Sequence, residues 1–355
     1  MTTRRSFLYL TSAGALATVA ACSSSGGSTG SASSAPASEA ATAGASATAD
    51  ASAGAGAGSS ASASAVAPDP SAFPVTVTDG KGEMTIEALP EKVVVLDVSA
   101  LDTLVALGVQ DRVIGVTANN NALPPSLQEF FPNAEIVGTF KEPDAEKIDA
   151  LGADLVIVGG RAADAYDAIA QDFTALLMPG DRSSAFSERL TAGAELLGKV
   201  FGLPAKATQE LDAYKSKVEK VKAKGSTVGT GLILLTSGGE VTAYGTGSRF
   251  GLIHDDLGVA PAIEDIKAEI HGESISFERI NEANPDWLFV VDRDAAVGDN
   301  GKAAKEILDT ELVTSTTAWS KDQVVYLDGE RWYIIGAGLH NAPAMVDEIA
   351  TAIKA

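Results

Sequence analysis

Cysteine, histidine and basic side chains are scarce in this sequence. Its 355 residues include one cysteine and three histidines, so the chain cannot form an internal disulfide or a cluster of cysteines around a metal. Lysine and arginine together number 26 against 47 aspartates and glutamates, which gives a formal net charge of −21. A chain this acidic is unsuited to nucleic acid and to electrostatic adhesion on anionic lipid. We therefore expect no nucleic-acid partner.

Common motifs of nucleotide binding and hydrolysis are also missing. The sequence has no GxxxxGK(S/T) phosphate loop, no GxSxG elbow and no HExxH pair. Gly245, Gly247 and Gly251 have the spacing GxGxxxG, but no evident strand-helix unit with a ribose-binding acid accompanies them. After the N-terminal segment, no apolar run is long enough to cross a membrane. The motifs thus indicate neither a catalytic residue nor a bound cofactor.

The N-terminal segment is typical of an exported lipoprotein. Arg4 and Arg5 form a twin-arginine start, and the apolar run that follows is too short for a permanent membrane helix. Residues 1–21 are therefore predicted to be a signal peptide for the twin-arginine route. The stretch VAAC ending at Cys22 resembles a lipobox, in which the cysteine is lipidated and becomes the first mature residue. More than one acyl chain would hold the protein stably on the outer face of the cell membrane; a buried structural thiol is the alternative.

The segment that follows has almost no large apolar residue. Residues 22–71 are mainly Ala, Ser, Gly and Thr, and such a segment buries too little to offset the entropy of ordering. We predict a disordered tether. The remainder is long enough for two lobes: an N-terminal α/β lobe over 72–184, connecting helices over 185–224, and a C-terminal α/β lobe over 225–355.

Two stretches with the same arrangement of residue types indicate two similar lobes. EKIDALGADLVIVGGR runs from Glu146 to Arg161, and ERINEANPDWLFVVDR runs from Glu278 to Arg293, at a constant offset of 132 residues. Each contains a run that is apolar on both strand faces, which is typical of a parallel sheet covered by helices. Each arginine then falls just past the carboxyl end of a strand, where open α/β sheets bind ligands. We predict two Rossmann-like lobes that each direct an arginine into a shared cleft; a chance repeat is the alternative.

Helical patterns connect the predicted lobes. Residues 186–201 have helical apolar spacing, and the next helix, 204–224, is rich in charge. A polar helix of this length is suited to bridging two bodies through solvent over roughly 30 Å, so we expect the lobes to close by small angles. A further helix is predicted over 248–257 with Ser248 as its N-cap. Arg249 would lie in its first turn, where the helix dipole disfavours a cation.

Six stretches together resemble one known family. They are KVVVLDVSALDTLVALGV (92–109), ADLVIVGGRAADAYD (153–167), SRFGLIHDDLG (248–258), HGESISFE (271–278), NPDWLFVVDR (284–293) and YLDGERWY (326–333). They are similar to the catecholate-siderophore-binding lipoproteins of bacterial iron ABC importers. The resemblance implies a class III periplasmic-binding-protein fold, with two Rossmann-like lobes joined by a long rigid α-helix. It also implies a monomeric receptor, not an enzyme, that hands ferric siderophore to a membrane permease with a cytoplasmic ATPase.

The resemblance places five ligand-binding residues in the cleft. The family's three arginines fall on Arg161, Arg249 and Arg293, and its iron-binding residues fall on His271 and Tyr333. A ferric ion held by three catecholates carries about three negative charges, which three guanidinium groups can match. Where a siderophore supplies only two catecholates, an imidazole and a phenolate can fill the two open coordination positions of the iron.

Each of these residues also has a purely structural interpretation. Arg293 is flanked by Asp292 and Asp294 and could pair with either. His271 could be an exposed loop residue, and Tyr333 could pack in an aromatic core. The resemblance further implies that Glu146 and Glu278 dock into arginine pockets of the permease. The alternative is that each is a glutamate favoured at a helix start by the dipole.

Two other functions stay open at this stage. The same fold could bind a different ligand, such as a hydroxamate siderophore, haem or cobalamin. An exported α/β enzyme could use Tyr333 or His271 as an acid or base, although no nucleophile, base and orienting group are evident. His254 is predicted to be a packed helical histidine. The roles of His340 and Arg331 are undecided.

Overall fold

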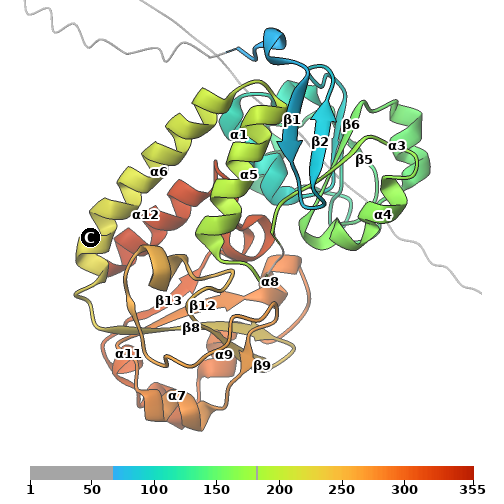
Figure 1. Cartoon of the computed structure of the whole chain (residues 1–355). Coiled ribbons are helices and arrows are strands. Elements are labelled where there is room, and N and C mark those ends of the chain that lie inside the picture. The colour runs from blue at the N-terminus through green and yellow to red at the C-terminus, as the bar shows by residue number, and fades with distance from the viewer. Residues whose placement is uncertain (1–66, 181–182) are drawn as a thin grey trace, which may run out of the picture. The chain divides into compact units, whose positions relative to one another are not determined.

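The computed structural model describes residues 67–180 and 183–355 (Figure 1). The predicted signal peptide, Cys22 and most of the predicted tether lie outside the described residues. The described chain opens with the short helix η1 (Pro70–Ala72), capped by the side chain of Asp69. The backbone N–H of Asp69 also donates to the carbonyl of Gly202 at 3.3 Å, which attaches the first described residues to the corner between helices α5 (Phe186–Val200) and α6 (Pro204–Gly225).

A five-stranded parallel sheet forms the centre of the N-terminal lobe. The strand order is β5-β4-β3-β6-β7, with bounds β3 (Val93–Val95), β4 (Val113–Val116), β5 (Glu135–Ile136), β6 (Leu155–Val158) and β7 (Ala175–Leu177). Its helices are α1 (Val98–Leu107), α2 (Pro125–Gln128), α3 (Ala145–Leu151) and α4 (Tyr166–Ile169), with η2 (Gln110–Arg112) and η3 (Gly160–Ala165) between them. Every residue of β3 and β6 is buried, as expected of strands covered by helices on both faces. An antiparallel hairpin of β1 (Val75–Thr78) and β2 (Glu83–Ile86) precedes the sheet.

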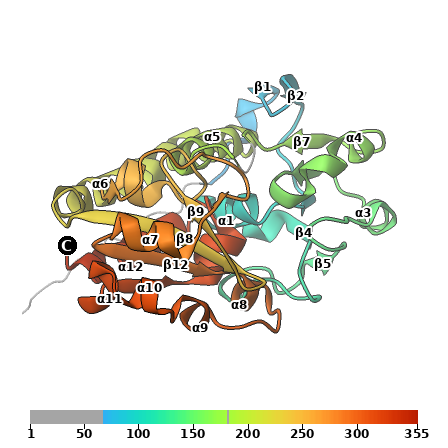
Figure 2. The ribbon, with the colours of Figure 1, turned by 90° about the horizontal axis from the view of Figure 1, so that it is seen from below.

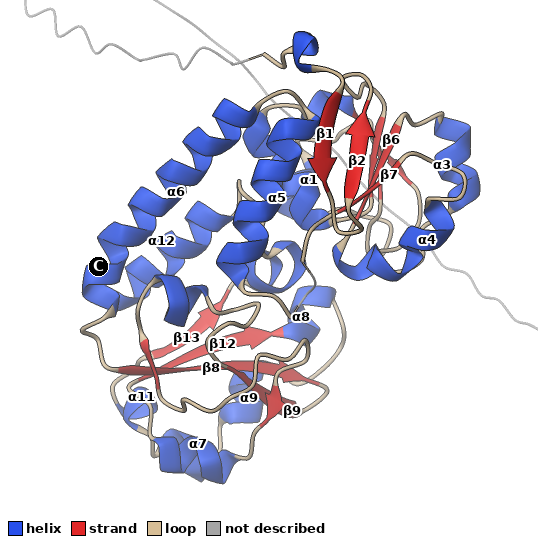
Figure 3. Cartoon of the chain, viewed as in Figure 1, coloured by secondary structure: helices blue, strands red, loops and turns tan. Residues whose placement is uncertain are grey.

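The C-terminal lobe has a second, mixed sheet. Its order is β11-β9-β8-β12-β13, and β10 also pairs with β8; the bounds are β8 (Thr230–Ser237), β9 (Glu240–Tyr244), β10 (Ala260–Pro261), β11 (Glu273–Ser274), β12 (Trp287–Asp292) and β13 (Val324–Leu327). Strands β8, β12 and β13 are parallel, whereas β9 runs antiparallel to β8. The helices are η4 (Leu252–Asp256), α7 (Phe277–Ala283), α8 (Arg293–Val297), α9 (Ala304–Leu308), α10 (Glu311–Thr314), α11 (Thr317–Ser320), η5 (Glu330–Ile335) and α12 (Ala342–Ile353). Figure 3 distinguishes the strands of both sheets from the helices around them.

The sequence repeat corresponds to a structural repeat. Helices α3 and α7 end at Gly152 and Asn284, which are 132 positions apart and both left-handed, the conformation that commonly ends a helix. Asp154 and Asp286 follow at the same offset. Each carboxylate accepts backbone N–H groups at the start of its lobe's central strand, from Lys92 at 3.0 Å and from Thr230 at 3.0 Å. The two stretches thus have the same structural role in each lobe.

Two long helices join the lobes. Helices α5 (Phe186–Val200) and α6 (Pro204–Gly225) pack against each other, and α12 packs on α6 (Figures 1 and 2). Helix α5 contributes to both cores: Phe186 and Leu190 pack in the core of the C-terminal lobe, whereas Leu197 and Val200 pack in that of the N-terminal lobe. The predicted fold class, two α/β lobes joined by a long helix, is confirmed.

The prediction of a helix over 248–257 is wrong for the first half of this range. Residues 246–250 form turns, and only Leu252–Asp256 is helical, as a π-helical turn. The hydroxyl of Ser248 donates to the carbonyl of Gly245 at 2.6 Å instead of capping a helix. The carboxylate of Asp255 accepts the N–H of Gly247 at 2.8 Å. These bonds hold the chain in turns, and Arg249 therefore does not face the unfavourable dipole of a first helical turn.

Candidate functional site

One cleft brings together all five side chains that the sequence singled out for ligand binding. It encloses about 930 Å³ and is lined by both lobes. Arg161 follows β6 in the N-terminal lobe, and Arg293 follows β12 in the C-terminal lobe. Arg249, His271 and Tyr333 come from the turn after β9, the turn before β11 and η5. The repeat therefore places its two arginines at the carboxyl ends of equivalent strands, where α/β sheets bind ligands.

Two of the arginines meet at a single backbone oxygen. Arg161 donates to the carbonyl of Tyr333 at 2.7 Å and to that of Ile334 at 3.3 Å. Arg249 donates to the same carbonyl of Tyr333 at 3.0 Å. The backbone of η5 thus holds two guanidinium groups side by side and links Arg161 of one lobe to the other lobe.

The ring of Tyr333 lies among the guanidinium groups. Its centroid is 5.3 Å from the guanidinium carbon of Arg161 and 5.0 Å from that of Arg249, distances at which a cation is attracted to an aromatic face. Its hydroxyl is hydrogen-bonded with Arg293. Burial raises the pKa of Tyr333, but this bond and the three positive charges outweigh burial and lower the pKa below its ordinary value. The site therefore favours the phenolate more than water does.

Arg293 is held by acidic partners as well as by Tyr333. Its guanidinium contacts Asp294 at 2.9 Å and Asp299 at 2.6 Å. The hydrogen bond to Asp294, followed by those to Tyr333 and Asp299, raises the pKa of Arg293 above its ordinary value against the effect of burial. Pairing with Asp294 is the structural interpretation that the sequence left open. The structure combines it with a position in the cleft, where 32% of the side chain is exposed.

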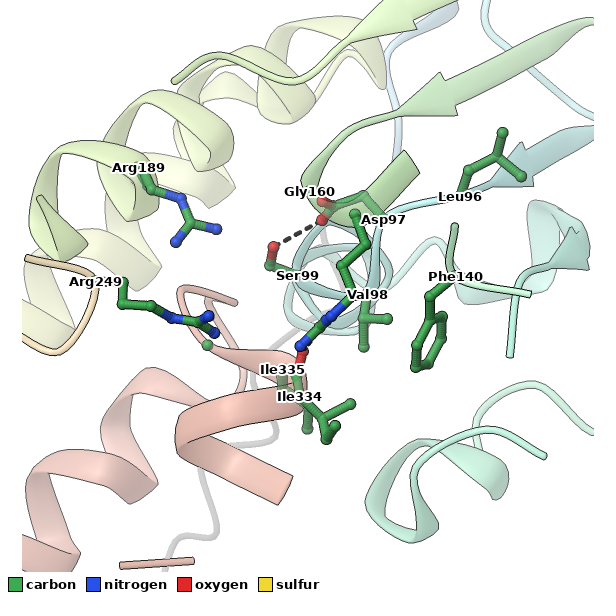
Figure 4. A pocket seen from close by; sticks show the side chains of 12 residues that line it. Leu96, Asp97, Val98, Ser99, Phe140, Gly160, Arg189, Arg249, Ile334 and Ile335 are labelled. Carbon is green, nitrogen blue, oxygen red and sulfur yellow. Dashed lines mark hydrogen bonds between the residues drawn. The ribbon is translucent and has the colours of Figure 1, made fainter. Parts of the chain in front are cut away.

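A fourth arginine near the cleft was missed by the sequence analysis. Arg189 of α5 lines a small cavity of about 20 Å³ together with Arg161 and Arg249. Figure 4 shows Arg189 extending from α5 toward Ser99, whose hydroxyl donates to the Asp97 carboxylate. Burial, and then the charges of Arg161 and Arg189, lower the pKa of Arg249. An anion next to Arg249 would relieve this repulsion.

His271 and the two predicted docking glutamates lie at exposed positions. His271 is exposed at the rim of the cleft, in a turn before β11. Glu146 and Glu278 are exposed in the first turns of α3 and α7 and do not line the cleft. Hydrogen bonds from its own backbone N–H and from Ser276 lower the pKa of Glu278, as expected at a helix start.

His254 and the two undecided side chains, His340 and Arg331, lie outside the cleft. His254 is buried, and its Nδ1 lies 2.8 Å from the carbonyl of Val259, which agrees with a packed histidine. His340 is exposed and stacks edge-on against Phe130. Arg331 pairs with Asp328 at 3.3 Å. Neither His340 nor Arg331 lines the cleft.

Loops that the sequence analysis passed over complete the cleft walls. Asn119 and Asn120 follow β4, Phe140 and Glu142 follow β5, and Tyr244 ends β9. Asn120 has a positive φ of 46°. The run Asn119-Asn120-Asn121 after an apolar strand is a turn signal, and it could have placed this loop at the sheet's carboxyl edge.

Two other features are absent from the described residues. Over 67–180 and 183–355, no helix is both long and apolar enough to cross a membrane. In the same part of the chain, no group of three or more His, Cys, Asp and Glu side chains is placed to hold a metal ion. The ionisable side chains that line the cleft are three arginines, one lysine, two tyrosines, one histidine, one glutamate and one aspartate.

Comparison with known proteins assigns this architecture. Residues 93–330 match the family described as "Periplasmic binding protein". The chain belongs to this family. Among periplasmic binding proteins, the petrobactin-binding protein YclQ of Bacillus subtilis is 35% identical over 267 residues, which cover 75% of this chain and 83% of that protein. The ferric-anguibactin-binding protein FatB of Vibrio anguillarum is 29% identical over 284 residues, covering 78% and 86%.

Solved structures of periplasmic binding proteins have the same fold. The crystal structure of YclQ matches with a TM-score of 0.74 and 34% identity, over 79% of this chain and 99% of that chain. The catecholate-siderophore-binding protein VctP of Vibrio cholerae matches with a TM-score of 0.69 and 28% identity, over 79% and 99%. The predicted resemblance to a family of siderophore-binding proteins is therefore confirmed.

Proposed function

We propose that this protein is an extracytoplasmic receptor that captures a ferric catecholate siderophore and delivers it to an ABC permease for iron uptake. The main support is the convergence of Arg161, Arg249 and Arg293 on one cleft between two lobes. Guanidinium groups match the charge and the oxygen donors of a ferric tris-catecholate. The names of YclQ and VctP, which bind petrobactin and a catecholate siderophore, point to the same class of ligand.

His271 and Tyr333 are proposed as ligands of an incompletely coordinated iron. Both line the cleft, and the lowered pKa of Tyr333 favours the phenolate that ferric iron requires. The hydrogen bond with Arg293 is compatible with this role, because an oxygen that accepts a hydrogen bond retains a lone pair for a metal. With a tris-catecholate, whose iron is fully coordinated, neither side chain is needed as a ligand.

The other parts of the proposal concern location and partners. Cys22 carries the lipid that holds the protein on the outer face of the cell membrane, after export by the twin-arginine route. The mature protein acts as a monomer without a cofactor, and it has no enzymatic activity. Glu146 and Glu278, exposed at equivalent positions of the two lobes, dock into the permease, whose cytoplasmic ATPase drives uptake.

A binding panel tests the ligand class. Purified protein is titrated with a ferric tris-catecholate, a ferric bis-catecholate and a neutral ferric hydroxamate, and the quenching of tryptophan fluorescence is recorded. We expect tight binding of both catecholates and at least about tenfold weaker binding of the hydroxamate, because only the catecholates carry the charge that the arginines match. Failure to bind either catecholate would refute the proposed ligand class, and tight binding of the hydroxamate alone would favour the neutral-ligand alternative.

A further inference from the structure

A second cavity opens beside the cleft. It encloses about 560 Å³, within the ~300–1,000 Å³ range of small-molecule pockets. We call it the side cavity; the residues that line both it and the cleft are Asn119, Asn120, Phe140, Val297 and Ile334. The side cavity and the cleft are therefore adjacent, and a ligand that reaches past these shared residues would enter the side cavity.

The side cavity has a different chemistry from the cleft. Its apolar walls come from both lobes, with Leu123 and Pro124 before α2 on one side and Ala296 and Leu327 on the other. No arginine, lysine or histidine is among the described residues that line it. An anionic group that moved from the cleft into this space would lose its guanidinium partners and gain none.

Two carboxylates line the side cavity, and both are hydrogen-bonded to backbone. Asp292 accepts the N–H groups of Ala295 at 3.0 Å and of Ala304 at 2.8 Å. Glu330 accepts the N–H of Ser126 at 3.0 Å, which connects η5 to α2 across the two lobes. These acids stabilise the walls of the cavity, and their negative charge further disfavours an anionic occupant.

We propose that the side cavity binds an uncharged, apolar arm of the ligand whose anionic ferric head is held by Arg161, Arg249 and Arg293. This inference rests on the proposed function and adds a selection rule to it. The arginines recognise the ferric head, which many siderophores share, whereas the side cavity selects among their backbones. An arm that ends in a carboxylate is rejected, because it would be desolvated beside Asp292 and Glu330 without a cation.

The test uses two synthetic ferric tris-catecholates that differ only in one hexyl chain on the chelator backbone. Their affinities for the wild-type protein are measured by fluorescence quenching. We expect the hexyl complex to bind at least about tenfold more tightly, because its chain leaves water for the side cavity. A third complex, whose chain ends in a carboxylate, should lose this gain.

The second part of the test fills the side cavity with a larger side chain. Ala122 and Ala295 are exposed residues that line it from opposite lobes, so Ala122→Trp and Ala295→Trp should each occupy the space without disturbing a core. Both variants should abolish the preference for the hexyl complex and leave the affinity for the plain complex within about twofold. The matched control is Ala150→Trp, at an exposed position of α3 outside both spaces.

The outcomes separate this inference from the proposed function. Equal binding of the plain and hexyl complexes by the wild type would overturn the side-cavity assignment. It would not affect the proposed recognition of the ferric head by the arginines. A preference that survives both tryptophan variants would overturn it as well, as would an equal loss of affinity for both complexes. If the wild type binds neither complex, the proposed function itself fails.

Discussion

Arg161 donates a hydrogen bond of 2.7 Å to the main-chain carbonyl of Tyr333 and thereby connects the two lobes at the centre of the cleft. Arg249 donates to the same oxygen at 3.0 Å. The shared acceptor keeps two like charges adjacent, although they repel each other. Such a preorganised pair favours an anionic ligand, because the cost of bringing the cations together is met during folding and not during binding.

Removing one of these charges should weaken ligand binding. We expect Arg249→Gln to lower the affinity for a ferric tris-catecholate about 10- to 100-fold, since hydrogen bonds to charged groups contribute about 1.5–3 kcal/mol. Fluorescence titration measures the effect. Arg331→Gln is the matched control, because Arg331 pairs with Asp328 away from the cleft lining. Equal affinities of wild type and Arg249→Gln would argue against anion recognition by this residue.

The proposed iron ligands should matter only for an incompletely coordinated iron. Tyr333→Phe and His271→Ala should each shift the ligand-to-metal absorption band of a bound ferric bis-catecholate and lower its affinity at least about tenfold. The spectrum of a bound tris-catecholate should not change. Tyr333→Phe keeps the ring and the carbonyl that accepts from Arg161, so it isolates the hydroxyl. An unchanged bis-catecholate spectrum in both variants would show that the iron has other ligands.

Stability should depend on pH through one buried carboxylate. Asp102 of α1 is 1% exposed, and it accepts the N–H groups of His340 and Asn341 at 2.9 Å each. Burial raises its pKa to about 7, although these hydrogen bonds and the charge of Arg331 oppose the rise. The native state therefore retains this proton up to about pH 7, whereas the unfolded chain releases it near pH 4. The stability that protonated Asp102 contributes to the native state is present below about pH 4 and is lost as the pH rises to about 7.

Replacing Asp102 by asparagine removes this titration. Asp102→Asn should have a higher Tm than the wild type at pH 8, by at least about 2 °C, and the difference between the two proteins should be smaller at pH 5. Differential scanning calorimetry at both pH values measures it, with the exposed Asp111→Asn as control. A difference that is the same at both pH values would mean that Asp102 keeps an ordinary pKa.

The two surface glutamates should affect transport without affecting binding. Glu146→Arg and Glu278→Arg reverse the charge that is proposed to enter arginine pockets of the permease, so each should reduce uptake of radiolabelled ferric siderophore by whole cells at least about fivefold. Ligand affinity of the purified variants should equal that of the wild type. Glu129→Arg and Glu306→Arg, exposed in the N- and C-terminal lobes respectively, are the controls. Normal uptake by both docking variants would remove this role.

Membrane attachment should depend on the single cysteine. Cys22→Ala removes the predicted lipidation site, and because acyl chains at this site are the proposed anchor, the variant should appear in the soluble extracytoplasmic fraction. Cell fractionation with immunoblotting measures the distribution, and Ser23→Ala is the control. Retention of Cys22→Ala on the membrane would indicate a different anchor.

Strands that are apolar on both faces were predicted well from the sequence. The runs at 155–158 and 287–291 correspond to β6 and β12, because a short run that is apolar on both faces is typical of a strand in a parallel sheet covered by helices. Helix boundaries were less predictable. Helix α1 begins at Val98, because the carboxylate of Asp97 accepts the N–H of Ala100 and caps the helix. An aspartate directly before an apolar run is a helix N-cap signal that can be seen in the sequence.

The site was predictable only where it follows a strand or a motif. Arg293 stands directly after β12 and Arg161 three residues after the end of β6, which places both at the carboxyl edge of their sheets. Arg189 gave no such signal, because it lies on an amphipathic helix and reaches the cleft region only through the packing of α5 against both lobes. Likewise, the conformation around Arg249 depends on Asp255, whose carboxylate accepts the N–H of Gly247 eight residues earlier.

Helix α5, whose two halves belong to different cores, also affects how the protein unfolds. If one lobe unfolded alone, part of this helix would become exposed, and the lobe that stayed folded would lose the packing contacts that the helix makes with it. The two lobes should therefore denature as one cooperative unit, with a single calorimetric peak whose van't Hoff and calorimetric enthalpies agree.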